Sequence, residues 1–325
     1  MTKRREFISA AVAGALLLSR LASAQPAHKV VRIGWLTPSD IEIHARSFRD
    51  AMHTLGYVEG QAYTIETRSA GNDLDRLPGL AAELASLKVD IIVAVSPPAI
   101  VAAKRATATI PIVMAYWGGG GLVESGVVAN LARPGGNVTG VSMLAVELEA
   151  KRLEFLLQAL PKARIVGVLD PGNGYTFGEI RGVAERGGVQ LRFATVGQGS
   201  DAYPRAFDVL KDARVEALLV PSSPRLFQDS RQIIDLAAAR RIPAIYEWPD
   251  MADAGGLMAY GPTFAELNAR VASFVQRILN GARPAVLAIE QPSKFELVVN
   301  LKTAKALGFT FPPPLLLRAA RVIGG

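Results

Sequence analysis

Six short segments in the first half of the chain recur in the second half, in the same order. The matched pairs are 33–38 (IGWLTP) with 166–171 (VGVLDP), 89–93 with 215–219, 96–98 with 222–224, 110–112 with 242–244, 135–136 with 255–256, and 146–148 with 265–267. The two members of a pair lie roughly 119 to 133 residues apart, and self-similarity at a nearly constant spacing indicates a repeated structural unit. The alternative is a chance likeness, because all βα units share hydrophobic strands and turn residues. The repeat predicts two similar lobes.

Each unit alternates short β-branched runs with segments of helical periodicity, which is typical of parallel strands covered by helices. In the first half we predict five strands, at 30–36, 64–68, 90–95, 112–116 and 138–142. Between the first two, apolar residues share one helical face; they are Ile41, Ala45, Phe48, Met52 and Leu55. We therefore predict an α/β fold with two lobes, each a parallel sheet flanked by helices.

The chain is expected to pass between the predicted lobes three times, near residues 143, 260 and 285. Lobe 1 then takes residues 25–143 and about 261–285, and lobe 2 takes residues 144–260 and about 286–325. The last crossing carries the segment 289–300 back to lobe 2.

The N-terminus has the three parts of an export signal. A basic stretch at 3–5 precedes an apolar run at 7–18, and the small-residue pattern Ala22-Ser23-Ala24 follows. The apolar run has about a dozen residues, whereas a membrane-spanning helix needs about 20. We predict that residues 1–24 are a signal peptide cleaved after Ala24, which leaves a soluble periplasmic protein. The stretch RREFI at 4–8 also resembles a twin-arginine signal, with an ordinary secretory signal as the alternative.

The composition excludes several classes of protein. With 50% hydrophobic and 20% charged residues, the chain is not disordered. It has no cysteine, which excludes disulfides, thiolate metal sites, cysteine nucleophiles and a lipid-modified cysteine. The formal net charge is +7, but the first 24 residues hold four basic residues against one acidic residue, so that +4 remains without them. This surplus is scattered along the chain, and we expect no nucleic-acid-binding face.

The candidate ligand contacts lie where the predicted strands end, because ligands of open parallel sheets bind beyond the carboxyl ends of the strands. From the first lobe we predict contacts by Ser39, Asp40, Ser96, Pro97, Trp117 and Gly118. From the second lobe we predict contacts by Asn173, Ser222, Ser223 and Glu247. This mixture suits a small polar or zwitterionic molecule. Helix-start amides would hold a carboxylate, Glu247 or Asp40 would hold an ammonium group, and a tryptophan would cover an apolar part.

These residues also have structural interpretations. Three serines are suited to cap the helices that follow them; these are Ser39, Ser96 and Ser222. Trp117 and Trp248 are suited to the core or to the lobe interface, and Glu247 and Asp250 to solvated charges at a helix start.

Four consecutive glycines at 118–121 lie between a predicted strand and a predicted helix, so a phosphate cradle has to be considered. The chain has neither G-x-x-x-x-G-K-[ST] nor G-x-G-x-x-G at the first βα turn. We therefore favour flexible backbone beside a cleft and expect no nucleotide cofactor.

The histidines give no sign of catalysis or of a metal site. His28 lies in the N-terminal tail, and we expect His44 and His53 on the solvated side of the first helix. Their spacing of nine is not the i, i+4 spacing of a metal pair, and G-x-S-x-G and H-E-x-x-H are both absent. An enzyme that uses only Asp or Glu stays open, because paired carboxylates have no reliable spacing. We favour binding over catalysis.

Six stretches spread over nearly the whole chain carry a resemblance to a known family. They are RREF at 4–7, GYVEGQ at 56–61, LARPGGNVTGVS at 131–142, AKRLE at 150–154, GGLMAYGP at 255–262 and QPSKFELVVNLKTAKALG at 291–308. In these the chain resembles the substrate-binding proteins of ABC transporters, in the group of tryptophan- and phenylalanine-type binders. The resemblance implies a two-lobed periplasmic binding fold, type I-like, with the ligand cleft between the lobes. It also implies an exported receptor that closes on a small solute by hinge motion and delivers it to a membrane permease with a cytoplasmic ATPase.

One departure concerns the ligand. Where relatives usually carry an Asp-Pro-Val-like segment after the fourth strand, this chain reads WGGGGLV at 117–123. The missing acidic residue belongs to the expected cleft, so the resemblance does not carry an aromatic amino acid over as the ligand. The change indicates a bulkier, less cationic or flatter solute.

We therefore predict a monomeric receptor of an ABC importer that binds a small polar, aromatic or amino-acid-like molecule and needs no cofactor or metal. One alternative is a sensory receptor whose closed form engages a membrane signalling protein. The other is a carboxylate-dependent hydrolase.

Overall fold

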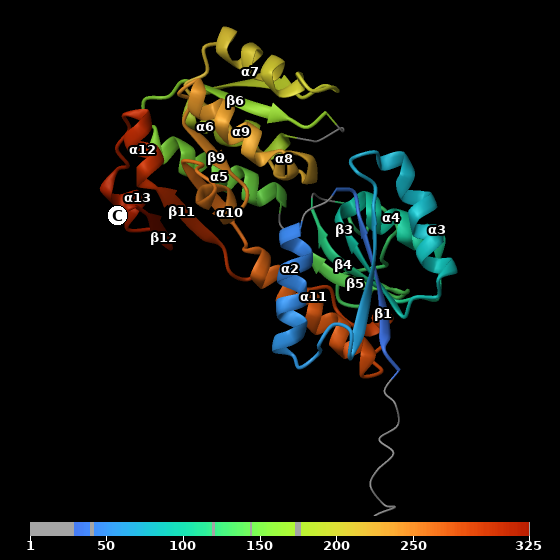
Figure 1. Ribbon diagram of the computed structural model, residues 1–325. Helices are drawn as coiled ribbons and strands as arrows, with labels where there is room; N and C mark the ends of the chain where they lie inside the picture. Colours follow the sequence, from blue (N-terminus) through green and yellow to red (C-terminus); the bar gives the residue numbers. More distant parts are fainter. Residues whose placement is uncertain (1–28, 40–41, 119–120, 144, 173–176, 325) are drawn as a thin grey trace, which may run out of the picture.

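The computed structural model describes residues 29–39, 42–118, 121–143, 145–172 and 177–324. The predictions for Asp40, Asn173 and the signal peptide 1–24 concern residues outside these described ranges. The chain forms two lobes, each built around one β-sheet (Figure 1).

The first lobe contains a five-stranded parallel sheet in the order β2-β1-β3-β4-β5. Its strands are β1 (Val31–Thr37), β2 (Tyr63–Ser69), β3 (Ile91–Val95), β4 (Ile112–Trp117) and β5 (Val138–Ser142). Its helices are α2 (Glu42–Thr54), η2 (Leu74–Arg76), α3 (Leu77–Ser86), α4 (Ser96–Ala106), α11 (Phe264–Leu279) and η3 (Pro284–Val286). Helices α2 and α11 pack side by side, and α3 packs on α4 (Figure 1). All of β3 is buried, as expected for a central strand with both faces covered.

The second lobe contains a seven-stranded sheet in the order β12-β11-β10-β9-β8-β6-β7. Its strands are β6 (Ile165–Asp170), β7 (Gln190–Thr195), β8 (Ala217–Leu219), β9 (Ala244–Tyr246), β10 (Met258–Gly261), β11 (Glu296–Asn300) and β12 (Arg321–Ile323). Its helices are α5 (Ala145–Ala159), α6 (Gly178–Gly187), α7 (Ala202–Asp212), α8 (Pro224–Gln228), α9 (Ser230–Ala239), α10 (Pro249–Asp253), α12 (Leu301–Leu307) and α13 (Pro313–Leu316). The predicted α/β fold of two parallel-sheet lobes flanked by helices is confirmed.

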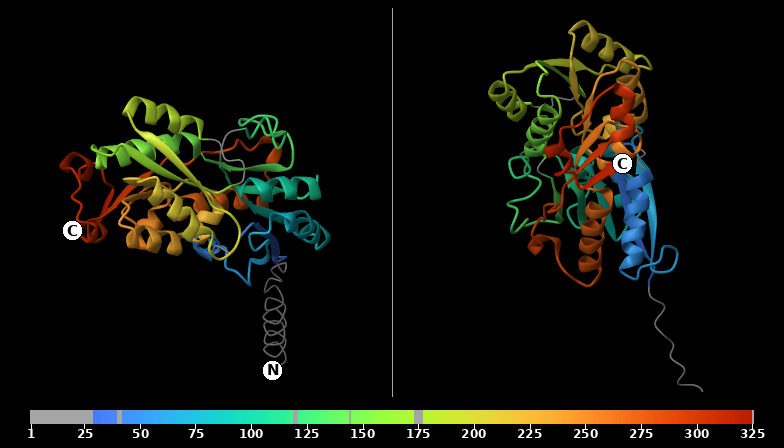
Figure 2. Two further views of the ribbon diagram at one scale, coloured as in Figure 1. Left: turned by 90° about the horizontal axis from the view of Figure 1, so that it is seen from above. Right: turned by 90° about the vertical axis from the view of Figure 1, so that its left-hand side faces the viewer.

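One pair of strands in the second lobe departs from the predicted parallel arrangement. Strand β11 runs antiparallel to β10. The reason is the path of the chain, because β10 leads out of the second lobe toward α11 and β11 returns from the same side. The C-terminal elements α12, α13 and β12 then lie at the end of the second lobe that is far from the first (Figures 1 and 2).

The sequence repeat has a counterpart in the packing. A Cβ atom added to Gly34 of β1 would lie 3.2 Å from the side chain of Val89. A Cβ atom added to Gly167 of β6 would lie 3.2 Å from the side chain of Val215. These four residues are partners in the repeat, so the same close approach to the sheet occurs once in each lobe.

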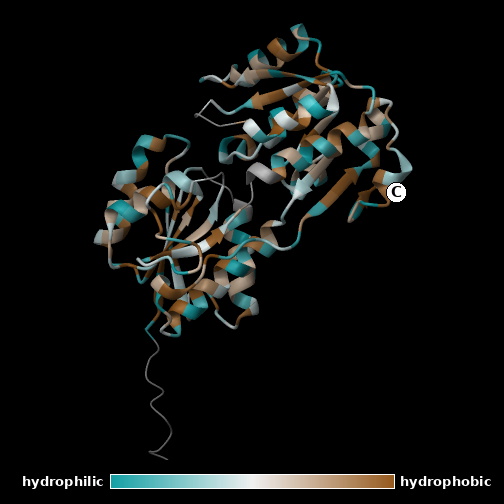
Figure 3. Ribbon diagram, turned by 180° about the vertical axis from the view of Figure 1, so that it is seen from behind, coloured by the Kyte–Doolittle hydropathy of each residue, from teal (hydrophilic) through white to brown (hydrophobic). Residues whose placement is uncertain are grey.

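The chain passes between the lobes after β5, between β10 and α11, and before β11 (Figure 1). Glu290 still belongs to the first sheet, because its carbonyl accepts from the Ser142 amide at 2.9 Å and its amide donates to Gly140 at 3.0 Å. The third crossing therefore starts after Glu290, a few residues beyond the expected position near 285. Hydrophobic residues concentrate on the strands, while hydrophilic residues lie on the outward faces of the helices (Figure 3).

Candidate functional site

The carboxyl ends of the two sheets meet at the junction of the lobes. Tyr116 lies near the end of β4 in the first lobe, and Trp248 follows β9 in the second. Their ring centroids are 6.2 Å apart, with an angle of 64° between the rings. Residues that follow the strands of either lobe are therefore brought into one region.

A buried polar cluster lies at the carboxyl edge of the second sheet. Glu247 directly follows β9 and is only 2% exposed. Ser222, which follows β8, donates its hydroxyl to Glu247 Oε1 at 2.5 Å. The Ser222 amide donates to Glu149 Oε1 at 2.6 Å, and Arg152 Nη1 lies 3.0 Å from the same oxygen. Two of the predicted contact residues, Ser222 and Glu247, are thus in direct contact.

The charge of Glu247 is balanced between opposing influences. Burial is the largest cause that raises the pKa of Glu247, the nearby Glu149 carboxylate adds a smaller rise, and the net pKa is about 7. Arg152 and the hydrogen bond from Ser222 oppose this rise in the pKa. Glu247 is therefore a buried carboxyl group that can gain or lose a proton near neutral pH, and the interpretation of a solvated helix-start charge is wrong.

Two buried hydroxyl groups lie at the carboxyl edge of the first sheet. Ser39 and Ser96 are both 0% exposed, and neither side-chain oxygen has a hydrogen-bond partner among the described residues. The Thr37 hydroxyl donates to the Ser39 carbonyl at 2.7 Å, which fixes the turn after β1. These hydroxyls can donate to or accept from a polar molecule.

The backbone of Ser96 is strained. Its φ is 73°, in the left-handed region, which costs an L-residue roughly 1–2 kcal/mol. Strain of this kind persists at sites where the geometry is needed for function. Helix α4 begins at Ser96 itself, and its N-cap position, Val95, makes no side-chain hydrogen bond. The capping interpretation is therefore wrong for Ser96.

The capping interpretation is also wrong for Ser222, because its hydroxyl is used by Glu247. Ser223 occupies the N-cap position of α8 without a side-chain hydrogen bond, and it is 5% exposed. Pro97 and Gly118 are half-buried at the ends of β3 and β4.

Trp117, the last residue of β4, packs into the core on the α3 and α4 side of the first sheet and is 5% exposed. Its neighbour Tyr116 belongs to the core on the opposite face, as alternation along a strand requires. A contact between Trp117 and a ligand stays a prediction.

The glycine run does not precede a helix. Between β4 and β5, residues 118 and 121–137 form turns and irregular structure, with no helix among them. The expected arrangement of strand, glycines and helix is therefore wrong, and the described residues here offer no helix N-terminus to hold a phosphate.

An aromatic cluster joins the two lobes. Trp248 stacks on Phe264 of α11, with centroids 4.2 Å apart and 13° between the rings. Phe227 of α8 lies 4.9 Å from Phe264, and His44 of α2 lies 4.1 Å from it. Trp248 is 2% exposed and packs on α11 of the other lobe, so of the two structural interpretations, core or lobe interface, the interface applies.

His44 is buried within this aromatic cluster, and the expectation of a solvated His44 is wrong. Helix α11 covers the side of α2 that the sequence pattern left to solvent. Asn268, which lies 224 residues further along the chain, places its Nδ2 atom 3.4 Å from His44 Nδ1. Burial lowers the pKa of His44 to about 3, so the imidazole is neutral near neutral pH.

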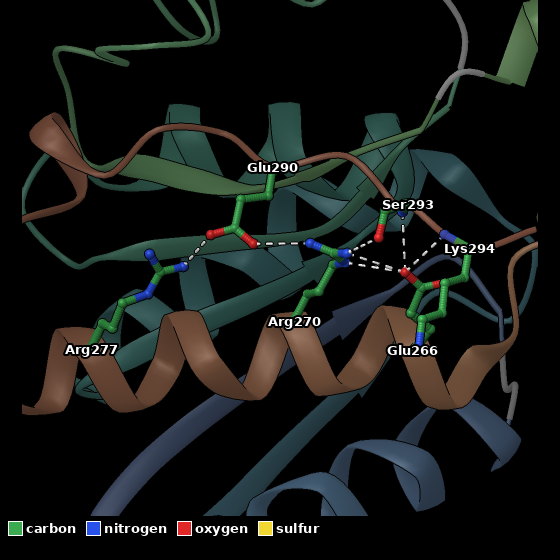
Figure 4. A network of polar contacts seen from close by, with 6 residues as sticks. All are labelled: Glu266, Arg270, Arg277, Glu290, Ser293 and Lys294. Atoms are coloured by element: carbon green, nitrogen blue, oxygen red, sulfur yellow. Dashed lines mark hydrogen bonds and ion pairs between the residues drawn. The ribbon is translucent and has the colours of Figure 1, made fainter.

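A polar network binds the third crossing segment to the first lobe (Figure 4). Arg270 of α11 donates to Glu266 at 3.2 Å, to Ser293 Oγ at 2.8 Å and to Glu290 at 3.3 Å. Arg277 donates to the other oxygen of Glu290 at 2.8 Å. The amides of Ser293 and Lys294 also donate to Glu266, at 3.2 and 3.3 Å, so the segment follows α11 as far as Lys294 and turns toward β11 after it (Figure 4).

Among the described residues, no group of three or more His, Asp or Glu side chains is placed to hold a metal ion. No helix in the described part of the chain has the length and apolar character that a membrane span requires.

Comparison with known proteins identifies relatives of this arrangement. The model of the family described as ABC transporter substrate binding protein matches residues 38–323. A curated tyrosine-binding protein of Clostridioides difficile (strain R20291) is 25% identical over 267 residues, which cover 81% of this chain and 75% of that protein.

Several solved structures share the fold. An ABC domain from Streptococcus pneumonia in complex with L-Trp has a TM-score of 0.80 at 22% identity, and the match covers 91% of this chain and all of that one. The ligand-free, open structure of a substrate binding protein with adhesive properties from Clostridium difficile has a TM-score of 0.63 at 24% identity. That match covers 91% of this chain and 100% of the other.

Proposed function

The chain belongs to the family of ABC transporter substrate binding proteins, and we propose that it is an exported receptor that binds one small solute with an ammonium group between its lobes. The solute class that fits best is an amino acid with an aromatic or other bulky side chain.

The observation that carries this proposal is the buried carboxyl group of Glu247. Glu247, Glu149 and Arg152 form a buried cluster with two carboxylates and one guanidinium group. A buried charge is stable only when it is paired, so this cluster favours one further positive charge. An ammonium group beside Glu247 supplies that charge, whereas a neutral sugar does not.

The first lobe offers the complementary contacts. The buried hydroxyls of Ser39 and Ser96 suit the carboxylate of an amino acid, whereas Pro97 and Pro98 leave few amide donors at the start of α4. A ligand closes the receptor only when it binds the closed state better than the open one, so it has to touch both lobes. The predicted contacts of both lobes fit this requirement.

The comparisons support the proposed class of solute and its position between the lobes. Tyrosine and L-Trp, the ligands in the names of two similar proteins, carry an α-ammonium group and an aromatic side chain. In overall shape the chain is nearer to the complex with L-Trp than to the ligand-free, open structure. The aromatic packing between Tyr116 and Trp248 is consistent with a closed arrangement.

The same proposal includes export of the chain, hinge motion of the two lobes and a membrane transporter as partner. The signal peptide 1–24 directs the chain out of the cytoplasm, and the mature protein is a monomer. Because the segment up to Lys294 is bound to the first lobe, the predicted boundary near 285 moves to about 294. Residues 25–143 with about 261–294, and 144–260 with about 295–325, then move as two lobes around the three crossings. A membrane permease with a cytoplasmic ATPase receives the solute.

A thermal-shift screen tests this function. Amino acids, aromatic acids, purines, sugars and small peptides are each added, and a ligand that binds only the folded state raises the unfolding midpoint. At a hundred times its dissociation constant the gain is about 2.7 kcal/mol. We expect hits among amino acids with large side chains and recovery of the solute unchanged. Hits confined to neutral sugars contradict the proposal, and chemical conversion of the solute favours the hydrolase instead.

The variant Glu247→Gln tests the role of the carboxylate. L-tyrosine and its deaminated analogue, 3-(4-hydroxyphenyl)propanoate, are compared by titration calorimetry. We expect the variant to lose affinity for L-tyrosine by at least tenfold, on the order of the loss of a buried charge pair. Glu154→Gln is the control, because Glu154 is a partly exposed carboxylate on α5 that pairs with Lys151. Equal loss for the deaminated analogue, or equal loss in both variants, contradicts the assignment.

A further inference from the structure

Arg152 is an arginine with no access to solvent, on the helix behind the candidate site. Its side chain is 0% exposed. Its Nε atom donates to the carbonyl of Tyr260 at 2.7 Å, at the end of β10. Its Nη1 atom lies 3.0 Å from Glu149 Oε1, and Nη2 has no hydrogen-bond partner among the described residues. An arginine buried in this way is costly to desolvate, so its position calls for a functional explanation.

A continuous chain of contacts leads from Arg152 to Glu247. Arg152 pairs with Glu149, and the same Glu149 oxygen accepts from the Ser222 amide at 2.6 Å. The Ser222 hydroxyl then donates to Glu247. The guanidinium and both carboxylates thus share one buried region, in which charges act on each other strongly because water does not screen them.

The described residues that act on Glu247 lie on α5 and in the loops after β8 and β9. Arg152 and Glu149 act from α5, and Ser222 and Trp248 are hydrogen-bond partners. Tyr116 of β4 also faces Glu247, and burial together with the charge of Glu247 raises the pKa of Tyr116. Tyr116 and the neutral His44 carry no charge near neutral pH. Among the residues that the structure describes, Arg152 and Glu149 are therefore the two charges that influence Glu247, and they act in opposite directions.

We propose that Arg152 and Glu149 are positioning residues that together set the charge of Glu247, and so make the receptor selective for solutes with a single ammonium group. Arg152 keeps Glu247 available as a carboxylate despite its burial. Glu149 holds Arg152 in place, and its negative charge offsets the positive charge of Arg152. The negative charge of Glu247 is therefore not fully compensated within the protein. This inference rests on the proposed function, because it specifies how that site selects its solute.

The proposal makes binding dependent on pH. An ammonium group binds the ionised form of Glu247, so binding releases the proton that Glu247 carries in part of the free receptor. Affinity should be constant well above pH 7 and should fall up to tenfold per pH unit below it. Removal of Arg152 should move this change to higher pH, and removal of the charge of Glu149 should move it to lower pH.

The test compares Arg152→Met and Glu149→Gln with wild type. Glutamine keeps an oxygen that can accept from the Ser222 amide. Lys151→Met is the matched control, because it removes a cation from the neighbouring position, where the side chain is 38% exposed and pairs with Glu154. The first readout needs no ligand: the infrared C=O band of protonated Glu247, identified by its loss in Glu247→Gln, is followed against pH.

We expect the midpoint of this band to rise in Arg152→Met and to fall in Glu149→Gln, each on the order of one pH unit, with no shift in Lys151→Met. Shifts in the same direction, or no shift in either variant, overturn the proposal. Should Arg152→Met fail to fold, Glu149→Gln decides alone, and an unchanged or raised midpoint overturns the proposal.

The second readout is the affinity for L-tyrosine against pH, which should follow the infrared midpoints in all variants. An affinity profile that stays the same while the infrared midpoints move overturns the claim of selectivity. Absence of L-tyrosine binding to wild type speaks against the proposed ligand class. The opposite infrared shifts still test the action of Arg152 and Glu149 on Glu247 in that case.

Discussion

Replacement of His44 by leucine should make the protein less sensitive to acid. His44 is buried among aromatic rings, and its ring centroid lies 4.1 Å from that of Phe264 and 5.9 Å from that of Tyr116. Burial lowers the pKa of His44 to about 3, whereas an exposed histidine in the unfolded chain has a pKa of about 6.5. The unfolded state therefore binds a proton at this position over a pH range in which the folded state does not.

The sign and the size of the effect follow from this difference. Above pH 6.5 both states are neutral at His44, and the residue adds no dependence on pH. As the pH falls below 6.5 the unfolded state gains a proton, and stability decreases by about 1.4 kcal/mol per pH unit until the folded pKa is reached. At about pH 5 the loss amounts to about 2 kcal/mol.

The assay is urea denaturation at about pH 7.5 and at about pH 5, for wild type, His44→Leu and His53→Leu. His53 is the control because it lies on the same helix and is exposed. The difference in unfolding free energy between the two pH values should be smaller by about 2 kcal/mol in His44→Leu than in wild type. An equal difference in wild type and His44→Leu, or an equal reduction in His53→Leu, refutes the reasoning.

Three further substitutions test other parts of the structure. Although partial burial opposes ionisation, the Arg32 amide and Lys29 hold the pKa of Asp90 below its usual range. Asp90→Asn should therefore lower the free energy of unfolding by about 1 kcal/mol at neutral pH. In strong acid the wild-type protein has lost the same contribution, so thermal melts should show no difference there. Arg270→Gln should lower the free energy of unfolding, followed by thermal melts, by roughly 1 kcal/mol at low salt and by less at high salt. A difference that does not depend on salt would contradict stabilisation by the ion pairs of Arg270. Ser96→Gly should relieve the strained φ and leave the melting temperature equal or higher while solute affinity falls, so unchanged affinity in calorimetry removes Ser96 from the site.

The sequence was sufficient to predict the elements that depend on local pattern. The strands predicted at 90–95 and 112–116 are found as the buried strands Ile91–Val95 and Ile112–Trp117. The repeated pair of Gly34 with Val89 and Gly167 with Val215 reflects the same packing in both lobes. These features are predictable because a buried parallel strand and a close helix approach each require particular residue types at neighbouring positions.

Features that depend on distant contacts could not be predicted. Helical periodicity assigned His44 to the solvated side of α2, since nothing near it in the sequence indicates that α11 packs there. Nothing in the stretch AKRLE at 150–154 singles out Arg152, because only the fold brings Tyr260, 108 residues later, to its Nε atom. The antiparallel β11 likewise follows from the path of the third crossing, which has no local signature.

The measurement that tests the central claim most directly is a calorimetric titration of the mature protein with L-tyrosine, L-tryptophan and L-phenylalanine, each beside its deaminated analogue. We predict that at least one amino acid binds with a stoichiometry of one, that its analogue binds at least tenfold more weakly, and that Ser96→Gly and Ser222→Ala, one change in each lobe, both weaken binding. Binding of the amino acid and its analogue with equal affinity, or loss of affinity confined to the variant of one lobe, contradicts a receptor that holds an ammonium-bearing solute between its lobes.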